Sequence, residues 1–305
     1  MDIFSAVRMV LERECPELEL RTQEPMARHT TFRVGGPARL MAFPKDKKEI
    51  KAAVRAADQM GIVPFFLGNG SNLLVADKGV EAFVIKTGGL DQTREVNRHL
   101  RAECGIPLSR LAVAALGRGL TGLEFAHGIP GSLGGAVVMN AGAYGGEMVQ
   151  VLTAVTYLDK HGQEHTVPAS ECSLTYRHSM FTDHPEWLVL EAEMELEQGD
   201  AEEIRAKMED LAQRRKSKQP LEYPSAGSTF KRPEGYFAAA LIEQCGLKGL
   251  TVGGAQVSEK HAGFVINRGG ATCADILKLT EQIKETVLRE TGVTLELEVR
   301  TLGCG

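Results

Sequence analysis

Apolar residues near the start of the chain recur with spacings that predict two amphipathic helices. In residues 2–14, apolar side chains three and four positions apart share one side of a helix. A second helix is predicted to begin at Asp46, because Glu49 three residues later matches a capping box. The short apolar runs 62–67 and 82–86 predict strands, and glycine-containing segments follow both of them.

The remainder of the chain mixes predicted helices and strands in both halves. Helices are expected at 108–116, 201–216, 236–245 and from Thr272 to about Glu290, and extended segments at 29–43, 151–158, 187–196 and 294–300. This order favours an α+β fold over a doubly wound parallel sheet. In the last strand, Glu298 falls on the charged side of an alternating pattern, which by default faces solvent.

Composition is ordinary except for glycine. With 305 residues the chain suggests about two domains, and 43% hydrophobic with 25% charged residues is typical of globular proteins. Glycine accounts for 33 residues, roughly 11% against a usual 7% or so, without the period of three of collagen. Ten of these glycines lie between residues 117 and 146. The excess therefore requires a local explanation.

Charge and cysteine usage exclude several classes of protein. A net charge of −5 argues against general nucleic-acid binding, and no apolar run is long enough to span a membrane. The first residues lack the basic and apolar parts of a secretory signal. The six cysteines are scattered without a CxxC motif, which argues against a zinc site or a disulfide framework. We expect a cytoplasmic protein with no nucleic-acid, membrane or metal partner.

Two glycine-rich segments carry the candidate chemistry. The segment Gly68-Asn69-Gly70-Ser71-Asn72 follows a predicted strand, and its backbone N–H groups could approach an anion closely. It is neither a P-loop nor a dinucleotide-binding fingerprint, and a plain turn between strands is the alternative. The second segment, 128–146, leaves so little room for side chains that a ligand or another backbone must pack there. Together they favour a cofactor that contains a pyrophosphate.

Seven motifs occur in a fixed order along nearly the whole chain. They are HTTFRVGG at 29–36, GNGSN at 68–72, the segment 128–146, YRHS at 176–179, AGSTFKRP at 226–233, GGAQV at 253–257 and LEVR at 297–300. Each motif is weak alone, but the ordered set resembles the UDP-N-acetylenolpyruvoylglucosamine reductases, the MurB flavoenzymes of peptidoglycan precursor synthesis. An inserted tyrosine loop of some members is absent here, so the sequence is similar to the shorter subtype.

The resemblance implies an organisation and a reaction. It implies an FAD-binding region of the vanillyl-alcohol-oxidase/PCMH type at 1–198, with subdomains of about 1–88 and 89–198. A substrate domain would follow at 199–305, and its last strand (about 294–301) would return a glutamate to the flavin. The implied reaction is NADPH-dependent reduction of UDP-N-acetylglucosamine enolpyruvate to UDP-N-acetylmuramate by a monomer. The first loop has Asn69 and no His or Cys, so noncovalent FAD is expected.

The resemblance also assigns contacts. The implied FAD contacts are Arg33, Gly68, Asn69, Gly70, Ser71, Asn72, Gly128, Ile129, Pro130, Gly131, Gly134, Gly135, Asn140, Ala141 and Gly142. The implied substrate contacts are Tyr144, Arg215, Lys218, Lys231 and Arg232. Arg232 stands where other members have asparagine, so its role is the least supported.

Arg177, Ser228 and Glu298 match the catalytic positions of the family. Hydride addition beside a carboxylate builds negative charge on its oxygens, and an arginine fork suits that charge. Glu298 helps there only if it is protonated, which requires a raised pKa. Ser228 would donate the proton to the neighbouring carbon, with Lys231 as a candidate assistant. Taken singly, an arginine such as Arg177 is usually in a surface ion pair, a serine such as Ser228 in a turn, and a glutamate such as Glu298 on a solvated strand face; only the joint pattern favours catalytic roles.

Two other functions remain as competitors. One is an FAD-dependent oxidase or dehydrogenase of the same fold that acts on another substrate. The other is a catalytically silent nucleotide-binding module. The basic residues around the Ser228 loop argue against the first, and the joint presence of Arg177, Ser228 and Glu298 argues against the second.

Overall fold

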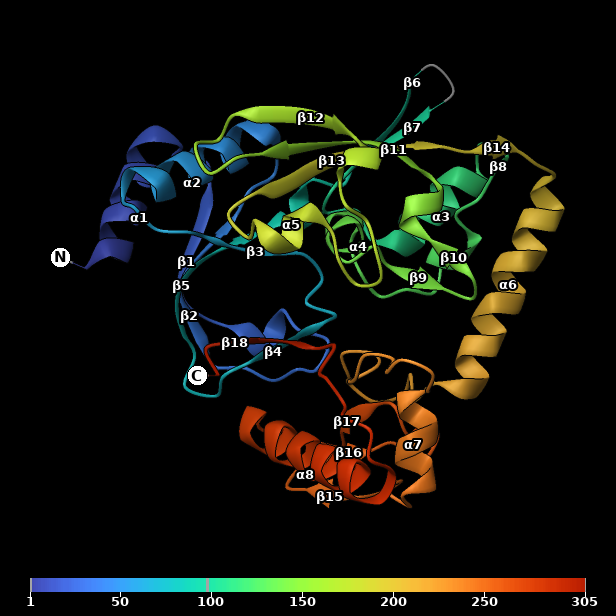
Figure 1. Cartoon of the computed structure of the whole chain (residues 1–305). Helices are drawn as coiled ribbons and strands as arrows, with labels where there is room; N and C mark the ends of the chain where they lie inside the picture. Colours follow the sequence, from blue (N-terminus) through green and yellow to red (C-terminus); the bar gives the residue numbers. More distant parts are fainter. Residues whose placement is uncertain (1, 97–98, 305) are drawn as a thin grey trace. The chain divides into compact units, whose positions relative to one another are not determined.

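The computed structural model describes residues 2–96 and 99–304, and the chain forms two compact units (Figure 1). The first unit comprises Met1–Thr22, Arg39–Asn69 and Ala82–Gln213, and the second comprises Gln23–Ala38, Gly70–Glu81 and Arg214–Gly305. Compactness therefore divides the chain elsewhere than at residue 199. The expected assignment of 1–198 to FAD and 199–305 to the substrate stays a prediction.

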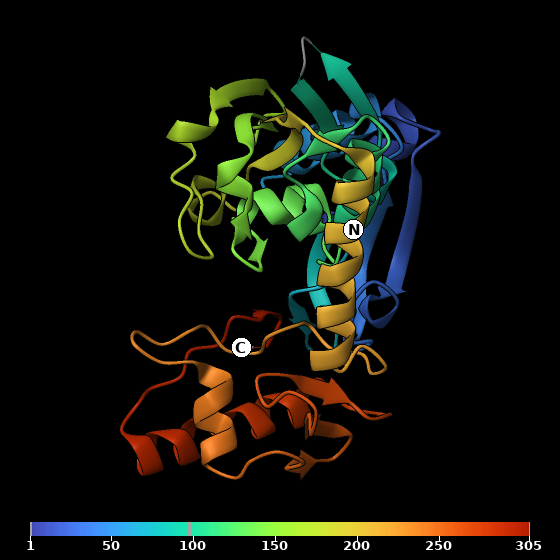
Figure 2. The ribbon, with the colours of Figure 1, turned by 90° about the vertical axis from the view of Figure 1, so that its right-hand side faces the viewer.

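The chain passes from one unit to the other five times, and four of these passages lie inside regular elements. They are three strands and a long helix: β1 (Glu19–Pro25), β2 (Pro37–Phe43), β5 (Val80–Lys86) and α6 (Ala201–Lys218). The fifth lies in the loop between Asn69 and Gly70. The strands belong to a four-stranded sheet of order β1-β2-β5-β3, in which β3 (Phe65–Leu67) runs parallel to β5. Helix α6 is the continuous gold helix of Figure 2.

Two capped helices begin the first unit. In α1 (Ile3–Glu14) the Asp2 carboxylate accepts the Ser5 N–H at 2.8 Å, and in α2 (Lys47–Gln59) the Asp46 carboxylate accepts the Glu49 N–H at 2.8 Å. The Glu49 carboxylate accepts the N–H of Lys45, not that of Asp46, so the predicted capping box is only half formed. Figure 1 shows the two helices side by side, and their apolar faces enter one hydrophobic core.

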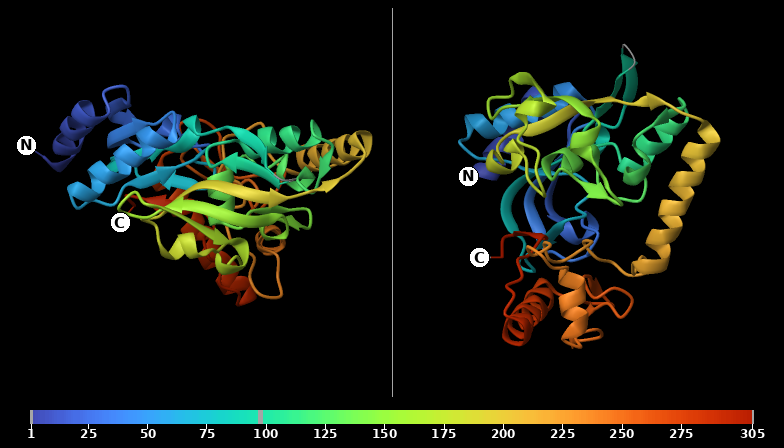
Figure 3. Two further views of the ribbon diagram at one scale, coloured as in Figure 1. Left: turned by 90° about the horizontal axis from the view of Figure 1, so that it is seen from above. Right: turned by 45° about the vertical axis from the view of Figure 1, so that its right-hand side comes forward.

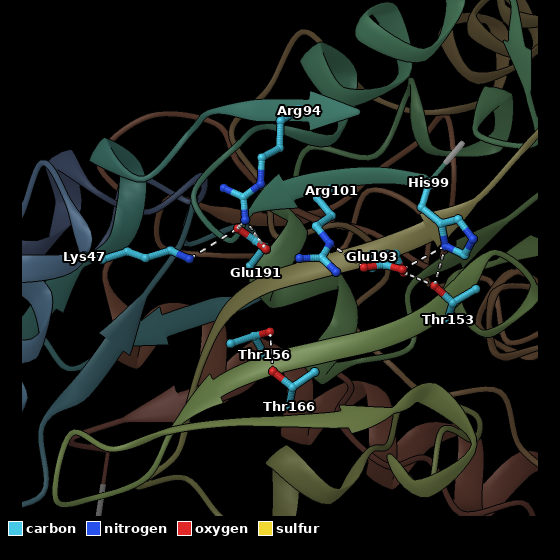
Figure 4. Close-up of polar contacts among 9 residues, drawn as sticks. All are labelled: Lys47, Arg94, His99, Arg101, Thr153, Thr156, Thr166, Glu191 and Glu193. Carbon is cyan, nitrogen blue, oxygen red and sulfur yellow. Dashed lines mark hydrogen bonds and ion pairs between the residues drawn. The ribbon is translucent and has the colours of Figure 1, made fainter. Parts of the chain in front are cut away.

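A five-stranded antiparallel sheet forms the centre of the first unit. Its order is β12 (Glu164–Pro168), β11 (Leu152–Leu158), β13 (Leu188–Glu195), β7 (His99–Glu103) and β6 (Thr93–Val96). Figure 4 shows polar side chains that link these strands. The Glu191 side chain is only 6% exposed, and it accepts two 2.8 Å hydrogen bonds from Arg94 and pairs with Lys47 at 3.3 Å. This pairing satisfies a carboxylate that burial would otherwise penalise.

Smaller elements complete the first unit. They are α3 (Leu108–Leu116), α4 (Leu133–Val138), α5 (Met180–Asp183), β8 (Leu120–Thr121) paired with β14 (Glu197–Gln198), and the hairpin of β9 (Gly142–Ala143) and β10 (Gly146–Glu147). Helix α3 has the bounds that its apolar spacing predicts. Helix α4 lies inside the glycine-rich segment, where the spacing of apolar residues predicts no helix.

The second unit packs two helices and short strands around its own core (Figure 3). It contains α7 (Ala238–Gln244), α8 (Cys273–Thr291), an antiparallel sheet of β15 (Thr251–Val252), β16 (Ala255–Val257) and β17 (Val265–Asn267), and a parallel pair of β4 (Leu73–Val75) and β18 (Arg300–Leu302). The capping box of α8 is confirmed, since Thr272 and Asp275 exchange hydrogen bonds of 3.0 Å.

The strand predicted at 294–300 is wrong in its bounds. Regular pairing covers only Arg300–Leu302, and Leu297 forms a single bridge with Phe230. The expected alternation survives in part, because Leu295 and Val299 are buried whereas the side chain of Glu296 is exposed. Among the described residues, no helix is sufficiently long and apolar to cross a membrane.

Lys86, the last residue of β5, is a largely buried cation in the first unit. Its ammonium donates a hydrogen bond to the carbonyl oxygen of Gly68. Burial lowers the pKa of Lys86 to about 8, because the charged form loses hydration. The folded chain therefore releases this proton at a lower pH than the unfolded chain does.

This difference predicts a pH-dependent stability. Between about pH 8 and 10.5 the unfolded chain keeps the Lys86 proton that the folded chain has lost, so the free energy of unfolding rises with pH relative to Lys86→Met. The rise approaches about 3 kcal/mol across that window. Urea titrations of both proteins at several pH values measure it, and buried thiols such as Cys104 cancel in the difference. Parallel curves for the two proteins would contradict this prediction.

Candidate active site

The two glycine segments meet within the first unit. A Cβ atom placed on Gly68 would lie less than 3.0 Å from Oγ of Ser132, and Nδ2 of Asn69 donates to the carbonyl of Pro130 at 3.4 Å. A side chain at Gly68 would therefore displace the Ser132 hydroxyl. The segments 68–69 and 130–132, which the sequence singled out separately, line one place in the structure.

Ser132 carries an unsatisfied polar atom at this place. The residue is 2% exposed, and its Oγ has no hydrogen-bond partner within the described parts of the chain. Buried hydroxyls are nearly always paired, so an orphaned one beside a glycine loop is what a bound acceptor or donor would satisfy. The neighbouring Gly134 has a different reason, because its Cβ position lies 2.9 Å from Cβ of Cys104.

Asn140 holds the end of the second glycine segment. Its side chain is saturated: Nδ2 donates to Glu147 Oε2 at 3.1 Å and to the Thr175 carbonyl at 3.2 Å, and Oδ1 accepts the Val149 N–H at 2.9 Å. The residue is 2% exposed and has a φ of 40°. Asn140 therefore anchors the hairpin that follows, whose turn contains Tyr144 with a φ of 54° and a 45% exposed side chain.

Arg177 lies in a tight turn attached to that anchor. Thr175 and His178 exchange backbone hydrogen bonds of 3.1 and 3.2 Å, and Arg177 between them has a φ of 57°. Ser179 Oγ donates to the Val138 carbonyl at 2.7 Å, which fixes the turn to the second glycine segment. A long side chain in the left-handed region costs about 1–3 kcal/mol, so the surrounding bonds must impose it. The Arg177 guanidinium lies 5.2 Å from the ring centroid of Tyr176.

The second half of the first loop belongs to the second unit. Gly70 has a φ of 61°, and a Cβ there would lie less than 3.0 Å from the carbonyl oxygen of His29. Thr31 N–H donates to the Gly70 carbonyl at 3.1 Å, so the HTTFRVGG segment packs on the loop. Arg33 in that segment is exposed and also has a left-handed φ of 55°.

Backbone hydrogen bonds bring Ser228 and Glu298 together in the second unit. Glu298 N–H donates to the carbonyl of Thr229 at 2.9 Å, and Asn72 Nδ2 donates to the carbonyl of Glu298 at 3.1 Å. Thr229 is 1% exposed, and its Oγ1 accepts the Val265 N–H at 2.9 Å. Ser228 is exposed beside this anchored residue. The first glycine loop, the serine loop and the glutamate segment thus share one location.

The predicted substrate cations of the second unit have varied surroundings. Lys231 Nζ pairs with Glu296 at 3.1 Å, and Arg232 lies 4.6 Å from the ring centroid of Phe237. Arg215 and Lys218 lie in the last turn of α6. The ion pair of Lys231 is solvent-exposed, so its expected role as an assistant of Ser228 stays a prediction. Arg177, Tyr144 and the 128–142 segment lie in the other unit.

Sequence reasoning missed two residues of the first unit. Ser132 lies inside the glycine motif but was not separated from its neighbours, and only its burial without a partner distinguishes it. Lys86 could have been noticed, because a lysine that closes an apolar strand beside a glycine loop is unusual. The backbone N–H groups of the loops, the Ser132 hydroxyl and the Lys86 ammonium together suit an anionic ligand rich in acceptor atoms.

Comparison with protein families assigns both halves of the chain. A family model described as FAD binding domain matches residues 38–168. A model described as UDP-N-acetylenolpyruvoylglucosamine reductase, C-terminal domain matches residues 219–302. The predicted FAD-binding α+β fold with a separate C-terminal domain is confirmed.

Individual relatives extend over nearly the full length. The chain is 50% identical over 287 residues to UDP-N-acetylenolpyruvoylglucosamine reductase of Caldanaerobacter subterraneus subsp. tengcongensis, with 94% of this chain and 95% of that protein covered. It is 46% identical over 303 residues to the reductase of Clostridium novyi, covering 99% and 97%. The crystal structure of the Thermus caldophilus reductase superposes with a TM-score of 0.79 at 36% identity, covering 93% and 98%. The chain therefore belongs to the UDP-N-acetylenolpyruvoylglucosamine reductase family.

Proposed function

We propose that the protein is an NADPH-dependent flavoenzyme that reduces UDP-N-acetylglucosamine enolpyruvate to UDP-N-acetylmuramate. Family membership over nearly the whole chain supports this reaction. The observation that supports it is the hydrogen bond from Glu298 N–H to the carbonyl of Thr229, the residue that follows Ser228. In a cell the reaction would serve peptidoglycan synthesis in the cytoplasm, and thereby cell shape and division.

We propose that the glycine segments hold FAD without a covalent bond. The residues of the first unit fit such a group: Gly68 leaves its side-chain position to Ser132, whose Oγ needs a partner, and Lys86 adds a positive charge. In the second unit Arg33 and Gly70–Asn72 would complete the contacts. When bound, FAD supplies the hydride-transfer chemistry between NADPH and the enolpyruvyl double bond.

Arg177 is proposed to bind the carboxylate of the enolpyruvyl group. Negative charge grows on those oxygens as the double bond is reduced, so a permanent cation stabilises the transition state more than the ground state. The turn of Arg177 is held by the bonds to Thr175, His178 and Ser179 before any ligand arrives. Little reorganisation is then required during the reaction.

Glu298 and Ser228 are proposed to act on neighbouring groups of the substrate. Glu298 would contact the carboxylate, and Ser228 would protonate the carbon beside it. An ionised Glu298 would repel the growing charge, so we propose that its carboxyl group is protonated and donates a hydrogen bond. Both backbone polar groups of Glu298 are engaged, which limits the positions of its side chain. Ser228 would deliver the proton to the carbon beside the carboxylate. Lys231, the candidate assistant of that serine, also pairs with Glu296 at 3.1 Å.

The cations of the second unit are proposed to bind the UDP diphosphate. Arg215 and Lys218 at the end of α6, with Lys231 and Arg232, provide positive charge in a chain of net charge −5. Tyr144 in the first unit would contact the substrate from its hairpin turn. These assignments rest on the family match of each position.

One experiment tests the function. The purified protein should show a flavin absorption spectrum, lose it with NADPH under anaerobic conditions, and regain it when the enolpyruvyl substrate is added. Rapid regain with oxygen and none with the substrate would instead indicate an oxidase of the same fold. A flavin that NADPH does not reduce would indicate a silent nucleotide-binding module, and a protein that takes up no FAD would refute the proposal.

The contact between Gly68 and Ser132 predicts how two substitutions change the affinity for FAD. Gly68→Ala should raise the dissociation constant of FAD about tenfold or more, because its Cβ meets Ser132 Oγ and displaces the loop. Adding Ser132→Ala should recover part of that affinity, since the remaining Cβ of residue 132 lies 3.4 Å away. Fluorescence titration of the apoprotein with FAD measures both values.

Two controls complete that comparison. Ser132→Ala alone gives the loss due to the hydroxyl, and Gly88→Ala should change nothing, because its nearest neighbour is Lys86 Cε at 3.8 Å. A double variant that binds FAD no better than Gly68→Ala would show that the contact is not what excludes a side chain.

Ser228→Ala should separate the two half-reactions. Reduction of the flavin by NADPH should stay within about twofold of wild type, whereas product formation should fall by about 100-fold or more, because proton donation contributes that much. Stopped-flow absorbance and product analysis measure the two steps. Ser225→Ala is the matched control, since Ser225 lies in the same loop and forms its bridge to Ile266 through the backbone. Normal product formation by Ser228→Ala would remove its proposed role.

A further inference from the structure

Two free thiols lie against each other in the second unit, and neither is assigned to the cofactor or the substrate above. Sγ of Cys273 and Sγ of Cys304 are 3.3 Å apart. Cys273 is the first residue of α8, and Cys304 follows β18 close to the end of the chain. The proposed reaction uses neither residue.

One short segment positions both sulfurs. On one side, β18 pairs in parallel with β4, and the Ala76 N–H donates to the Leu302 carbonyl at 2.9 Å. On the other side, the Asp77 carboxylate accepts the N–H groups of Cys273 at 2.7 Å and Ala274 at 3.1 Å. Residues 73–77 therefore hold the chain end and the start of α8 in register. The short distance between the two sulfurs therefore follows from hydrogen bonds that fix the backbone on both sides.

The two sulfurs differ in access and in chemistry. Cys273 is 3% exposed, and burial together with the neighbouring Cys304 and Asp77 raises the pKa of its thiol. Cys304 is half-buried. A small oxidant dissolved in water therefore reaches Cys304 first, and Cys273 is the thiol placed to react second.

We propose that Cys273 and Cys304 form an oxidation site whose product is an intramolecular disulfide and whose oxidant is hydrogen peroxide. The Cys304 sulfur attacks one peroxide oxygen, the O–O bond breaks, and a sulfenic acid and one water form. The Cys273 sulfur then displaces the sulfenic oxygen, and the S–S bond and a second water form. Two thiols lose two electrons and two protons, and one peroxide becomes two waters.

The expected effect is stabilisation and not inhibition. The sulfurs need to approach only from 3.3 Å to about 2.05 Å, so the surrounding structure changes little. The new bond closes a loop from residue 273 to residue 304, which includes α8 and the segment that carries Glu298. Closing that loop restricts the unfolded chain, so the midpoint of thermal unfolding should rise by roughly 5 °C.

Mass spectrometry of the full chain tests the site. After treatment with a small molar excess of hydrogen peroxide, free thiols are alkylated and the protein is digested without reductant. The expected result is one linked pair of peptides containing Cys273 and Cys304, absent after dithiothreitol, with the higher unfolding temperature lost at the same time. Cys304→Ser should abolish the linked pair, whereas Cys245→Ser should keep it, because Cys245 is another half-buried thiol.

Other results of the same experiment would contradict the proposed disulfide. Six alkylated thiols after peroxide treatment, or sulfinic acid on Cys304 with Cys273 still free, would overturn the proposal. In Cys304→Ser, a peptide containing Cys273 that is still linked to another cysteine would also overturn it. Cys304→Ser changes a residue at the chain end and is expected to fold, so the comparison does not depend on altering the buried Cys273.

Discussion

Close packing at Gly68 and Gly70 is the constraint on which the 68–72 loop depends. A Cβ on Gly70 would come within 3.0 Å of the His29 carbonyl at a φ of 61°, so this position requires glycine, whereas a Cβ on Gly68 would displace the Ser132 hydroxyl. In each unit, a hydrogen bond connects this loop to another segment of proposed function. Asn69 bonds to Pro130 in the first unit, and Asn72 bonds to the carbonyl of Glu298 in the second.

The elements that the sequence predicted well are those set by local interactions. Helix α3 follows from its apolar spacing, and α8 follows from the Thr272–Asp275 capping box and ends at Gly292, with a φ of 73°. The motifs that revealed the family also depend only on residue order. The segment 294–300 failed as a strand because its backbone partners, Thr229 and Lys231, come from a loop some 65 residues earlier, and no local pattern encodes that partner.

The reason for each glycine could not be predicted from the sequence. The sequence showed where glycine is concentrated but not what fills the vacated space. The structure separates the causes: Gly134 packs against Cys104 and Gly146 against Phe125, whereas Gly68 leaves its position to a hydroxyl that has no partner in the described chain. Part of the excess is thus required by the packing of the protein itself, and only part points to a cofactor.

Residues with a strained backbone conformation overlap with the residues that the motifs single out. Six residues other than glycine have a positive φ in the described chain, and four of them, Arg33, Asn140, Tyr144 and Arg177, were assigned to the site by motif alone. Such conformations persist only where surrounding bonds impose them, as the three side-chain bonds of Asn140 do. Because that amide also holds the Thr175 carbonyl, the arginine turn is fixed by a residue whose own side chain is already saturated. In the first unit the Arg177 turn is therefore organised by hydrogen bonds within the protein, and this is why proposed ligand contacts and purely structural residues alternate along one segment.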